Sequence, residues 1–172
     1  MIGNHKTAML PDAPWGDRNQ TKRRAKGLET MVVYVFSDAK SGYCKIGHTF
    51  SLKKRIGGLM RQLGTELQIV YWIEVTKKDA LRVERKAQKL LRLAGFKPIR
   101  GREWFEVSEA LASHSVRLSA RAVGANVIST AGMPWALDPS KSEIAEVLAE
   151  PIAEMAKNGR LDREIWAPQG RG

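Results

Sequence analysis

Residues 31–36 (MVVYVF) and residues 43–47 (YCKIG) decide how this chain folds. The first stretch is rich in Val and aromatic residues, as buried strands are, and it ends at a run of turn formers, residues 37–42. The second stretch follows so closely that the two strands can pair as antiparallel neighbours. The sequence therefore predicts a β-hairpin that begins at Met31 and ends at Gly47.

Two amphipathic segments after the hairpin are predicted to be helices. Ser51 can cap the first, which ends at Gly64, and Thr76 opens a longer one that ends near residue 94. The apolar run at 67–75 between them is typical of a buried strand. We therefore expect an α+β fold, with a small central antiparallel sheet built in the order β-hairpin, helix, strand, helix and flanked by helices.

The chain is predicted to have four parts. Residues 1–30 mix Pro, Gly and Asn without a steady hydrophobic period, and we interpret them as a mobile basic arm. The main domain spans residues 31–107 and closes with an edge strand at 103–107. A helical extension at 108–130 and a linker with a helical C-terminal segment at 131–172 complete the chain.

The charge of the chain is strongly positive and unevenly spread. The net charge is +11, and residues 31–107 hold 16 Lys or Arg against 7 Asp or Glu, while residues 108–172 hold 7 against 8. A surplus of this kind attracts polyanions by Coulomb steering and counterion release. The charge therefore favours a nucleic-acid partner for the main domain, with a basic surface kept only for solubility as the alternative.

Composition excludes several other classes. Cys44 is the only cysteine, which rules out an internal disulfide framework and a zinc site built from cysteines of this chain. The longest apolar run is too short to span a bilayer, and the polar N-terminus lacks the apolar region of a secretory signal. We expect a cytoplasmic protein without a membrane partner.

Four side chains from four predicted elements have the chemistry that phosphodiester hydrolysis needs. They are a phenol (Tyr34), an amine (Lys45), a guanidinium (Arg55) and a carboxylate (Glu84). Hydrolysis requires an activated water and cations that offset the charge building on the phosphate. The arginine fork suits phosphate oxygens.

Two of the four, Glu84 and Tyr34, have a structural explanation as well. Glu84 borders the apolar stripe of its helix, so its burial requires either a metal ion or a salt bridge to Arg55 or another basic neighbour. Tyr34 can be a core tyrosine whose hydroxyl is tied to a neighbour. A nearby Lys45 ammonium would instead stabilise the Tyr34 phenolate and make it a better proton acceptor.

The motif set resembles the GIY-YIG endonuclease superfamily, and within it the bacterial and phage branch. The matching motifs are Val33-Tyr34-Val35, Lys45-Ile46-Gly47 with Thr49, Arg55, Glu84, and a closing Glu103-Trp104-Phe105. Two positions depart from the family name, Val32 where it has glycine and Lys45 where it has tyrosine. The ordered set is more specific than any single triplet.

The resemblance implies a metal-dependent endonuclease that hydrolyses DNA phosphodiester bonds with one metal ion and no covalent intermediate. Tyr34 would accept the proton of the attacking water, and Lys45 would assist it. Arg55 would hold the scissile phosphate, and Glu84 would bind Mg²⁺ or Mn²⁺. The alternative is a catalytically inactive GIY-YIG-like module that binds DNA without cutting it.

Several further residues are weaker candidates. His48 and Tyr43 could assist at the site, although a partly exposed histidine and a packed strand tyrosine are the plainer readings. Four basic residues could contact the phosphates of double-stranded DNA or simply be solvated: Lys53, Lys54, Arg100 and Arg102. For the segment at 131–172, docking on the core, a homodimer contact and a partner site all stay open.

Overall fold

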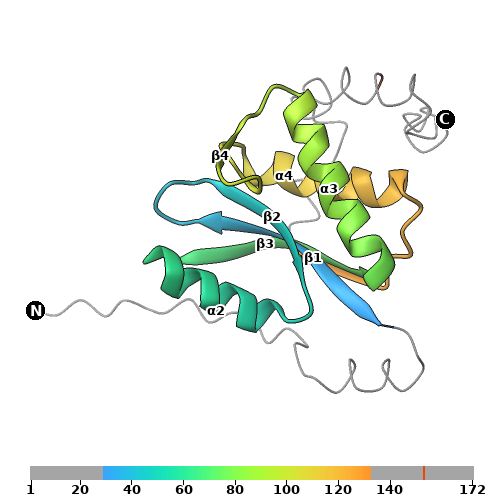
Figure 1. Cartoon of the computed structure of the whole chain (residues 1–172), viewed down its shortest axis with the longest axis horizontal. Helices are drawn as coiled ribbons and strands as arrows, with labels where there is room; N and C mark the ends of the chain where they lie inside the picture. The colour runs from blue at the N-terminus through green and yellow to red at the C-terminus, as the bar shows by residue number, and fades with distance from the viewer. Residues whose placement is uncertain (1–28, 133–152, 154–172) are drawn as a thin grey trace, which may run out of the picture.

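The computed structural model describes residues 29–132 and residue 153, and within them it has one six-stranded sheet and three helices (Figure 1). All strand pairs are antiparallel, in the order β4-β5-β2-β1-β3-β6. The elements in chain order are β1 (Thr30–Asp38), β2 (Cys44–Thr49), α2 (Leu52–Leu63), β3 (Leu67–Thr76), α3 (Lys77–Leu93), β4 (Pro98–Arg100), β5 (Trp104–Phe105), α4 (Glu109–Ala122) and β6 (Ser129–Gly132).

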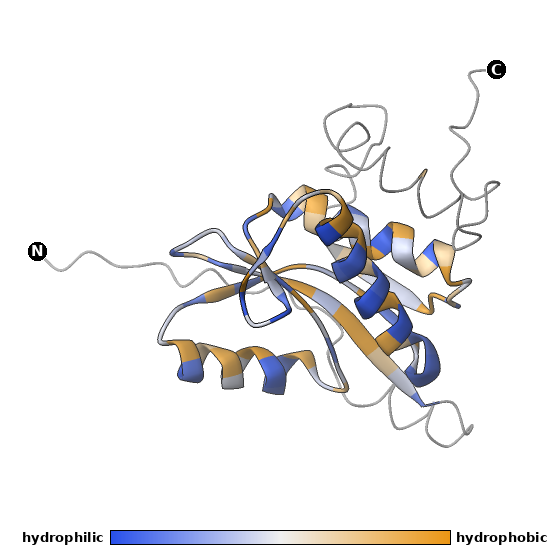
Figure 2. Ribbon diagram, turned by 45° about the horizontal axis from the view of Figure 1, so that its top comes forward, coloured by the Kyte–Doolittle hydropathy of each residue, from blue (hydrophilic) through white to orange (hydrophobic). Residues whose placement is uncertain are grey.

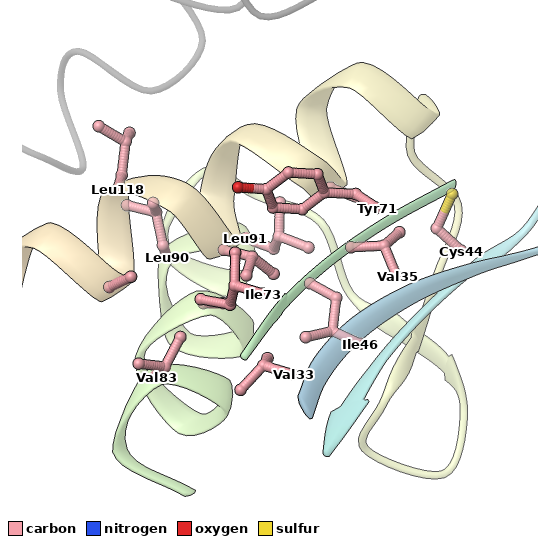
Figure 3. Packing of buried hydrophobic residues seen from close by; sticks show 14 of the residues in the cluster. Val33, Val35, Cys44, Ile46, Tyr71, Ile73, Val83, Leu90, Leu91 and Leu118 are labelled. Atoms are coloured by element: carbon pink, nitrogen blue, oxygen red, sulfur yellow. The ribbon is translucent and has the colours of Figure 1, made fainter. Parts of the chain in front are cut away.

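The sheet separates two layers of helices. Helix α2 covers one face, and α3 and α4 cover the other (Figure 1). Because side chains alternate along a strand, Val33 and Val35 of β1 enter the core under α3 and α4, while Tyr34 and Phe36 face α2. The larger core also takes in Ile46 of the sheet, with helix residues such as Leu90 and Leu91 packed on the same face (Figure 3). The predicted α+β fold with a central antiparallel sheet is confirmed.

Local signals explain why the helices begin and end where they do. The hydroxyl of Ser51 accepts a hydrogen bond from the backbone N–H of Lys54, and that of Thr76 accepts one from Asp79. Gly64 ends α2 in the left-handed conformation, with φ of 65°, which glycine adopts without the strain a Cβ would cause. The predicted hairpin, both capped helices and the strand after α2 are all present.

The closing strand is shorter than predicted and does not lie at the edge. β5 holds only Trp104 and Phe105, and it pairs with β2 on one side and β4 on the other. β4 begins at Pro98, which an outermost strand tolerates because its missing N–H needs no partner. Arg100 ends this strand. Three residues are too few to show an alternating pattern, so β4 could not be predicted from periodicity.

Residues 108–132 complete the folded layers and do not form a purely helical extension. Leu111, Ala112 and Val116 of α4 are buried in the larger core. β6 pairs with β3, and the hydroxyl of Ser129 donates to the carboxylate of Glu74 at 2.7 Å. The sequence of β6 has no apolar alternation, so this segment could not be predicted as a strand. Backbone hydrogen bonds hold it at the edge of the sheet.

The predicted arm at 1–30 falls almost wholly outside the described residues, and so does the linker with its C-terminal segment, including the homodimer contact considered for it. In the part of the chain that the structure describes, no helix is long and apolar enough to cross a membrane.

Candidate functional site

The candidate site lies at the outer edge of β2, where β5 stops pairing with it. β5 pairs with Cys44 and Lys45, and the N–H of Ile46 still donates to the carbonyl of Glu103 at 3.0 Å. The carbonyl of Ile46 accepts instead from the side chain of Gln88 on α3, at 3.2 Å. Helix α3 therefore reaches this edge from one face of the sheet, while α2 lies on the other face.

Tyr34 is fully buried on the α2 side, and its hydroxyl is held by an arginine. Arg55 Nε donates to Tyr34 Oη at 3.2 Å, and the Tyr34 ring stacks on Phe36 with centroids 3.9 Å apart. Arg55 is itself exposed on α2, so this side chain lies at the surface of the domain. A basic side chain at the surface thus contacts a phenol inside.

Gly47 makes room for this phenol. It pairs with Tyr34 across β1 and β2, and a Cβ at Gly47 would lie 2.5 Å from Tyr34 Oη. Real Cβ atoms do not approach an oxygen that closely, so the Tyr34 ring could not keep its place beside any other residue. The glycine of the second motif is therefore a steric requirement of the site.

We expect Gly47→Ala to destabilise the fold by about 1–3 kcal/mol, because overpacking forces the Tyr34 ring to move. Gly58→Ala is the matched control, since nothing lies within 4 Å of a Cβ built there. Because Gly58 is inside α2, its replacement should stabilise the protein by roughly 0.5–1 kcal/mol. Urea unfolding of both variants gives the comparison, and equal midpoints would contradict this view of Gly47.

Glu84 is buried on α3, with 7% of its surface exposed, and its two oxygens have different partners. One accepts from Gln88 Nε2 at 3.0 Å, and the other contacts His48 Nδ1. A salt bridge from Glu84 to Arg55 or to another basic neighbour was one expectation. The structure places the His48 ring beside this carboxylate, and not the Arg55 guanidinium. His48 is partly exposed, as expected, but it belongs to the site.

Lys45 is buried beneath a carboxylate and an indole. Its ammonium contacts the Glu103 carboxylate and lies 5.8 Å from the centroid of the Trp104 ring, which Arg100 also approaches, at 5.9 Å. Burial, with the positive charge of Arg55 acting in the same direction, lowers the pKa of Lys45 to about 8, against the opposing charge of Glu84. The amine therefore titrates close to neutral pH.

The protonation of Tyr34 differs from the sequence-based expectation. Burial raises the pKa of Tyr34, the hydrogen bond and charge of Arg55 lower it less, and the charge of Glu84 adds to the rise. The Lys45 ammonium does not contact this hydroxyl, because Glu103 holds it. The prediction that Lys45 stabilises the phenolate is therefore wrong for the resting site, where Tyr34 keeps its proton.

The four candidate side chains nevertheless converge on one place. Arg55 touches Tyr34 directly, and the charges of Arg55 and Glu84 act on both Tyr34 and Lys45. They come from β1, β2, α2 and α3, so the hairpin and the two helices on opposite faces build the site together.

The weaker candidates are divided between this place and its surroundings. Four are exposed at the surface: Lys53 and Lys54 on α2, and Arg100 and Arg102 in and after β4. Tyr43 lies beside the hairpin turn, where its carbonyl accepts from Asp38, about 13 Å along the strand from Gly47 at ~3.3 Å per residue. Tyr43 also packs, partly buried, against the cluster that contains Tyr34, Phe36 and Trp104.

Sequence reasoning missed two residues that hold the site. Gln88 follows Glu84 by four positions, a spacing that places both on one side of α3 and could have indicated the contact. Glu103 belongs to the closing motif, but the sequence assigned it no role. No pattern within its own segment indicates a contact with Lys45, which lies 58 positions away.

Taken together, the fold and the site define an α+β domain whose polar side chains meet at the exposed edge of a hairpin, between helices on opposite sheet faces. The model of the T5orf172 domain matches residues 31–120, just over half of the 172 residues, and the chain belongs to this family. The match covers β1 to most of α4, and it includes every residue of the site. Searches of curated proteins and of solved structures find no match.

Proposed function

We propose that this domain is a metal-dependent endonuclease that hydrolyses phosphodiester bonds of DNA by the one-metal mechanism of the GIY-YIG superfamily, which its motifs resemble. One observation carries the proposal: a phenol, an amine, a guanidinium and a carboxylate from four elements act on one another at one edge of the sheet. A stable core gains nothing from gathering these groups, since burying charged side chains is costly. A reaction on an anionic substrate needs all four.

Tyr34 and Lys45 are the proposed route for the proton of the attacking water. Because burial raises the pKa of Tyr34, its phenol must lose a proton before it can accept one. Lys45, with a pKa of about 8, can take that proton through a bridging water when its amine is neutral. The water then transfers its proton to the Tyr34 oxygen and attacks the phosphorus, and the P–O bond to the leaving group breaks.

Arg55 is the proposed phosphate-binding residue. Its Nε is engaged by the Tyr34 hydroxyl, while a guanidinium carries five N–H donors and the side chain is exposed. The remaining donors can bind phosphate oxygens as a fork. The same residue thus positions the phenol against the phosphate that it holds.

Glu84 is the proposed metal ligand, and its surroundings fit Mg²⁺ or Mn²⁺. Magnesium commonly takes only one or two protein carboxylates and keeps several waters, so a lone carboxylate is a sufficient anchor. Each oxygen of a carboxylate can accept more than one hydrogen bond or metal bond. The contacts with His48 and Gln88 orient the Glu84 carboxylate. Within residues 29–132 and 153, no group of three or more His, Cys, Asp or Glu side chains could hold a metal. When bound, the ion would offset charge on the phosphate.

The second candidate is a DNA-binding module that does not cut. The raised pKa of Tyr34 and the contact of Lys45 with Glu103 favour it, because they leave the resting site without a strong base. The experiment that separates the two uses supercoiled plasmid with Mg²⁺, with Mn²⁺ and with EDTA. We expect nicking or linearisation with either metal and none with EDTA, whereas binding without cleavage under every divalent ion tested would support the second candidate.

The rate of nicking is expected to rise with pH up to about 8 and then level off, because the neutral Lys45 amine is the active form. The Glu103 carboxylate favours the ammonium, so Glu103→Gln should lower the pKa of Lys45 and move the rise to lower pH. Single-turnover rates between pH 6 and 9.5 measure both curves. A rate that falls through pH 8 would mean that the ammonium is the active form.

A further inference from the structure

We propose that the outer surface of α3 is a second DNA-contacting surface, which binds the phosphate backbone of double-stranded DNA beside the site. The surface is a row of basic residues, here named the α3 basic stripe: Lys78, Arg82, Arg85, Lys89 and Arg92. None of these residues was a sequence-based candidate. The choice of DNA as the partner rests on the proposed function, and the presence of the stripe does not.

The spacing of the stripe places its members on one side of the helix. They recur at intervals of four, three, four and three residues, which follows the period of about 3.6 residues per turn. Lys89 is partly exposed and the other four are exposed. Hydrophilic segments accordingly recur along α3, between the apolar ones that face the sheet (Figure 2). From Lys78 to Arg92 the stripe is about 21 Å long at ~1.5 Å per residue.

The stripe runs directly beside the site. Arg85 and Lys89 each follow by one position the two residues, Glu84 and Gln88, that face the edge of β2. One position turns a helix by about 100°, so these cations flank the carboxylate without covering it. At the far end, Arg92 Nη1 donates to the carbonyl of Arg102 at 3.5 Å, which joins the stripe to the basic loop after β4.

Repulsion between members of the stripe destabilises their own helix. Like charges at i, i+4 destabilise a helix by about 0.2–0.5 kcal/mol per pair, and Lys78–Arg82 and Arg85–Lys89 are two such pairs. Arg82 forms an ion pair with Asp79, at 3.1 Å, whereas Lys78, Arg85 and Lys89 have no ion pair within the described ranges. A polyanion bound along the row would neutralise this repulsion, which gives the stripe a binding role.

The chemistry of the stripe selects the backbone and not the bases. It contains no aromatic residue on which an unpaired base could stack. The row of cations is straight, rigid and about 21 Å long, so along the axis of a duplex, where each strand advances ~3.4 Å per phosphate, it spans roughly six base-pair steps. We therefore expect contacts that do not depend on DNA sequence and that prefer duplex to single strands.

The test measures binding of the full chain to a 20-base-pair duplex in EDTA, by fluorescence anisotropy at several salt concentrations. Arg85→Gln with Lys89→Gln should weaken binding, and the slope of log affinity against log salt should fall by about 1.8, since each lost phosphate contact removes ~0.9. Two duplexes of unrelated sequence should be affected equally. The control pair is Lys40→Gln with Arg121→Gln, both exposed and outside the stripe.

Each result either supports or overturns the proposal that the α3 basic stripe binds DNA. An unchanged slope, or an equal fall in the control pair, would overturn it, and so would an equal or larger loss on a single strand of the same length. The substitutions remove like-charge contacts, so an unchanged or raised melting temperature confirms that the variant is folded. Because binding is measured without metal, a failure of the stripe is distinct from a failure of cleavage, which only the plasmid assay reports.

Discussion

Glu84→Gln is expected to reduce Mg²⁺-dependent nicking by about 10²–10⁴-fold, because a bound metal supplies several kcal/mol of transition-state stabilisation and each 1.36 kcal/mol is tenfold in rate. The substitution keeps the size of the side chain and its carbonyl oxygen, so the hydrogen bond from Gln88 can remain. The measurement is the single-turnover nicking rate over a range of Mg²⁺ concentrations. Duplex affinity in EDTA should stay close to that of the unchanged protein.

Glu66→Gln is the matched control for this substitution, since Glu66 is an exposed carboxylate outside the site. It should nick plasmid at the unchanged rate. High Mn²⁺ should restore part of the rate of Glu84→Gln, because a weakened site still fills at sufficient metal concentration. If the Glu84→Gln protein stays folded and cuts at the unchanged rate, Glu84 takes no part in the mechanism.

Tyr34→Phe is the second substitution with a large expected effect, a loss of about 10²–10⁴-fold in nicking rate, the usual contribution of a general base. Phenylalanine keeps the ring and its stacking on Phe36, and it removes only the hydroxyl that Arg55 contacts. The fold should therefore survive, with a melting temperature changed by a few degrees at most for a loss of about 1 kcal/mol. Duplex binding should be retained.

Tyr71→Phe is the control for this variant. Tyr71 is a buried tyrosine of β3 in the larger core, on the opposite face of the sheet from Tyr34. Loss of its hydroxyl tests whether any buried phenol affects cleavage. Equal nicking rates for Tyr34→Phe and the unchanged protein would mean that another group acts as the base. A loss of rate in both Tyr34→Phe and Tyr71→Phe would mean that lower stability, and not a missing base, explains the effect.

The protonation of the site follows from burial more than from the charges that sequence reasoning emphasised. Tyr34 and Lys45 are both almost inaccessible to solvent, and burial is the largest influence on each. It favours the neutral form of both, so the pKa of Tyr34 rises and that of Lys45 falls. Because of these two pKa shifts, the Lys45 amine becomes neutral at a pH at which the Tyr34 phenol still keeps its proton.

Local patterns were sufficient to predict most of the elements. Ser51, Gly64 and Thr76 act within one turn of their own positions, and the Val and aromatic residues that predicted β1 are consecutive in the sequence. The position of Glu84 beside an apolar stripe also predicted its burial. Sequence patterns could not predict β4 and β6, which are short strands held by backbone pairing, β4 with the nearby β5 and β6 with the distant β3.

The amino-acid sequence by itself determined the hairpin, the capped helices, the basic middle of the chain and the four candidate residue types. Only the tertiary structure decided their partners: Arg55 with Tyr34, His48 with Glu84, and Glu103 with Lys45. These contacts join positions 21, 36 and 58 residues apart. Periodicity and capping report interactions within a few residues, whereas a pKa depends on the burial and charges that folding brings together from the whole domain.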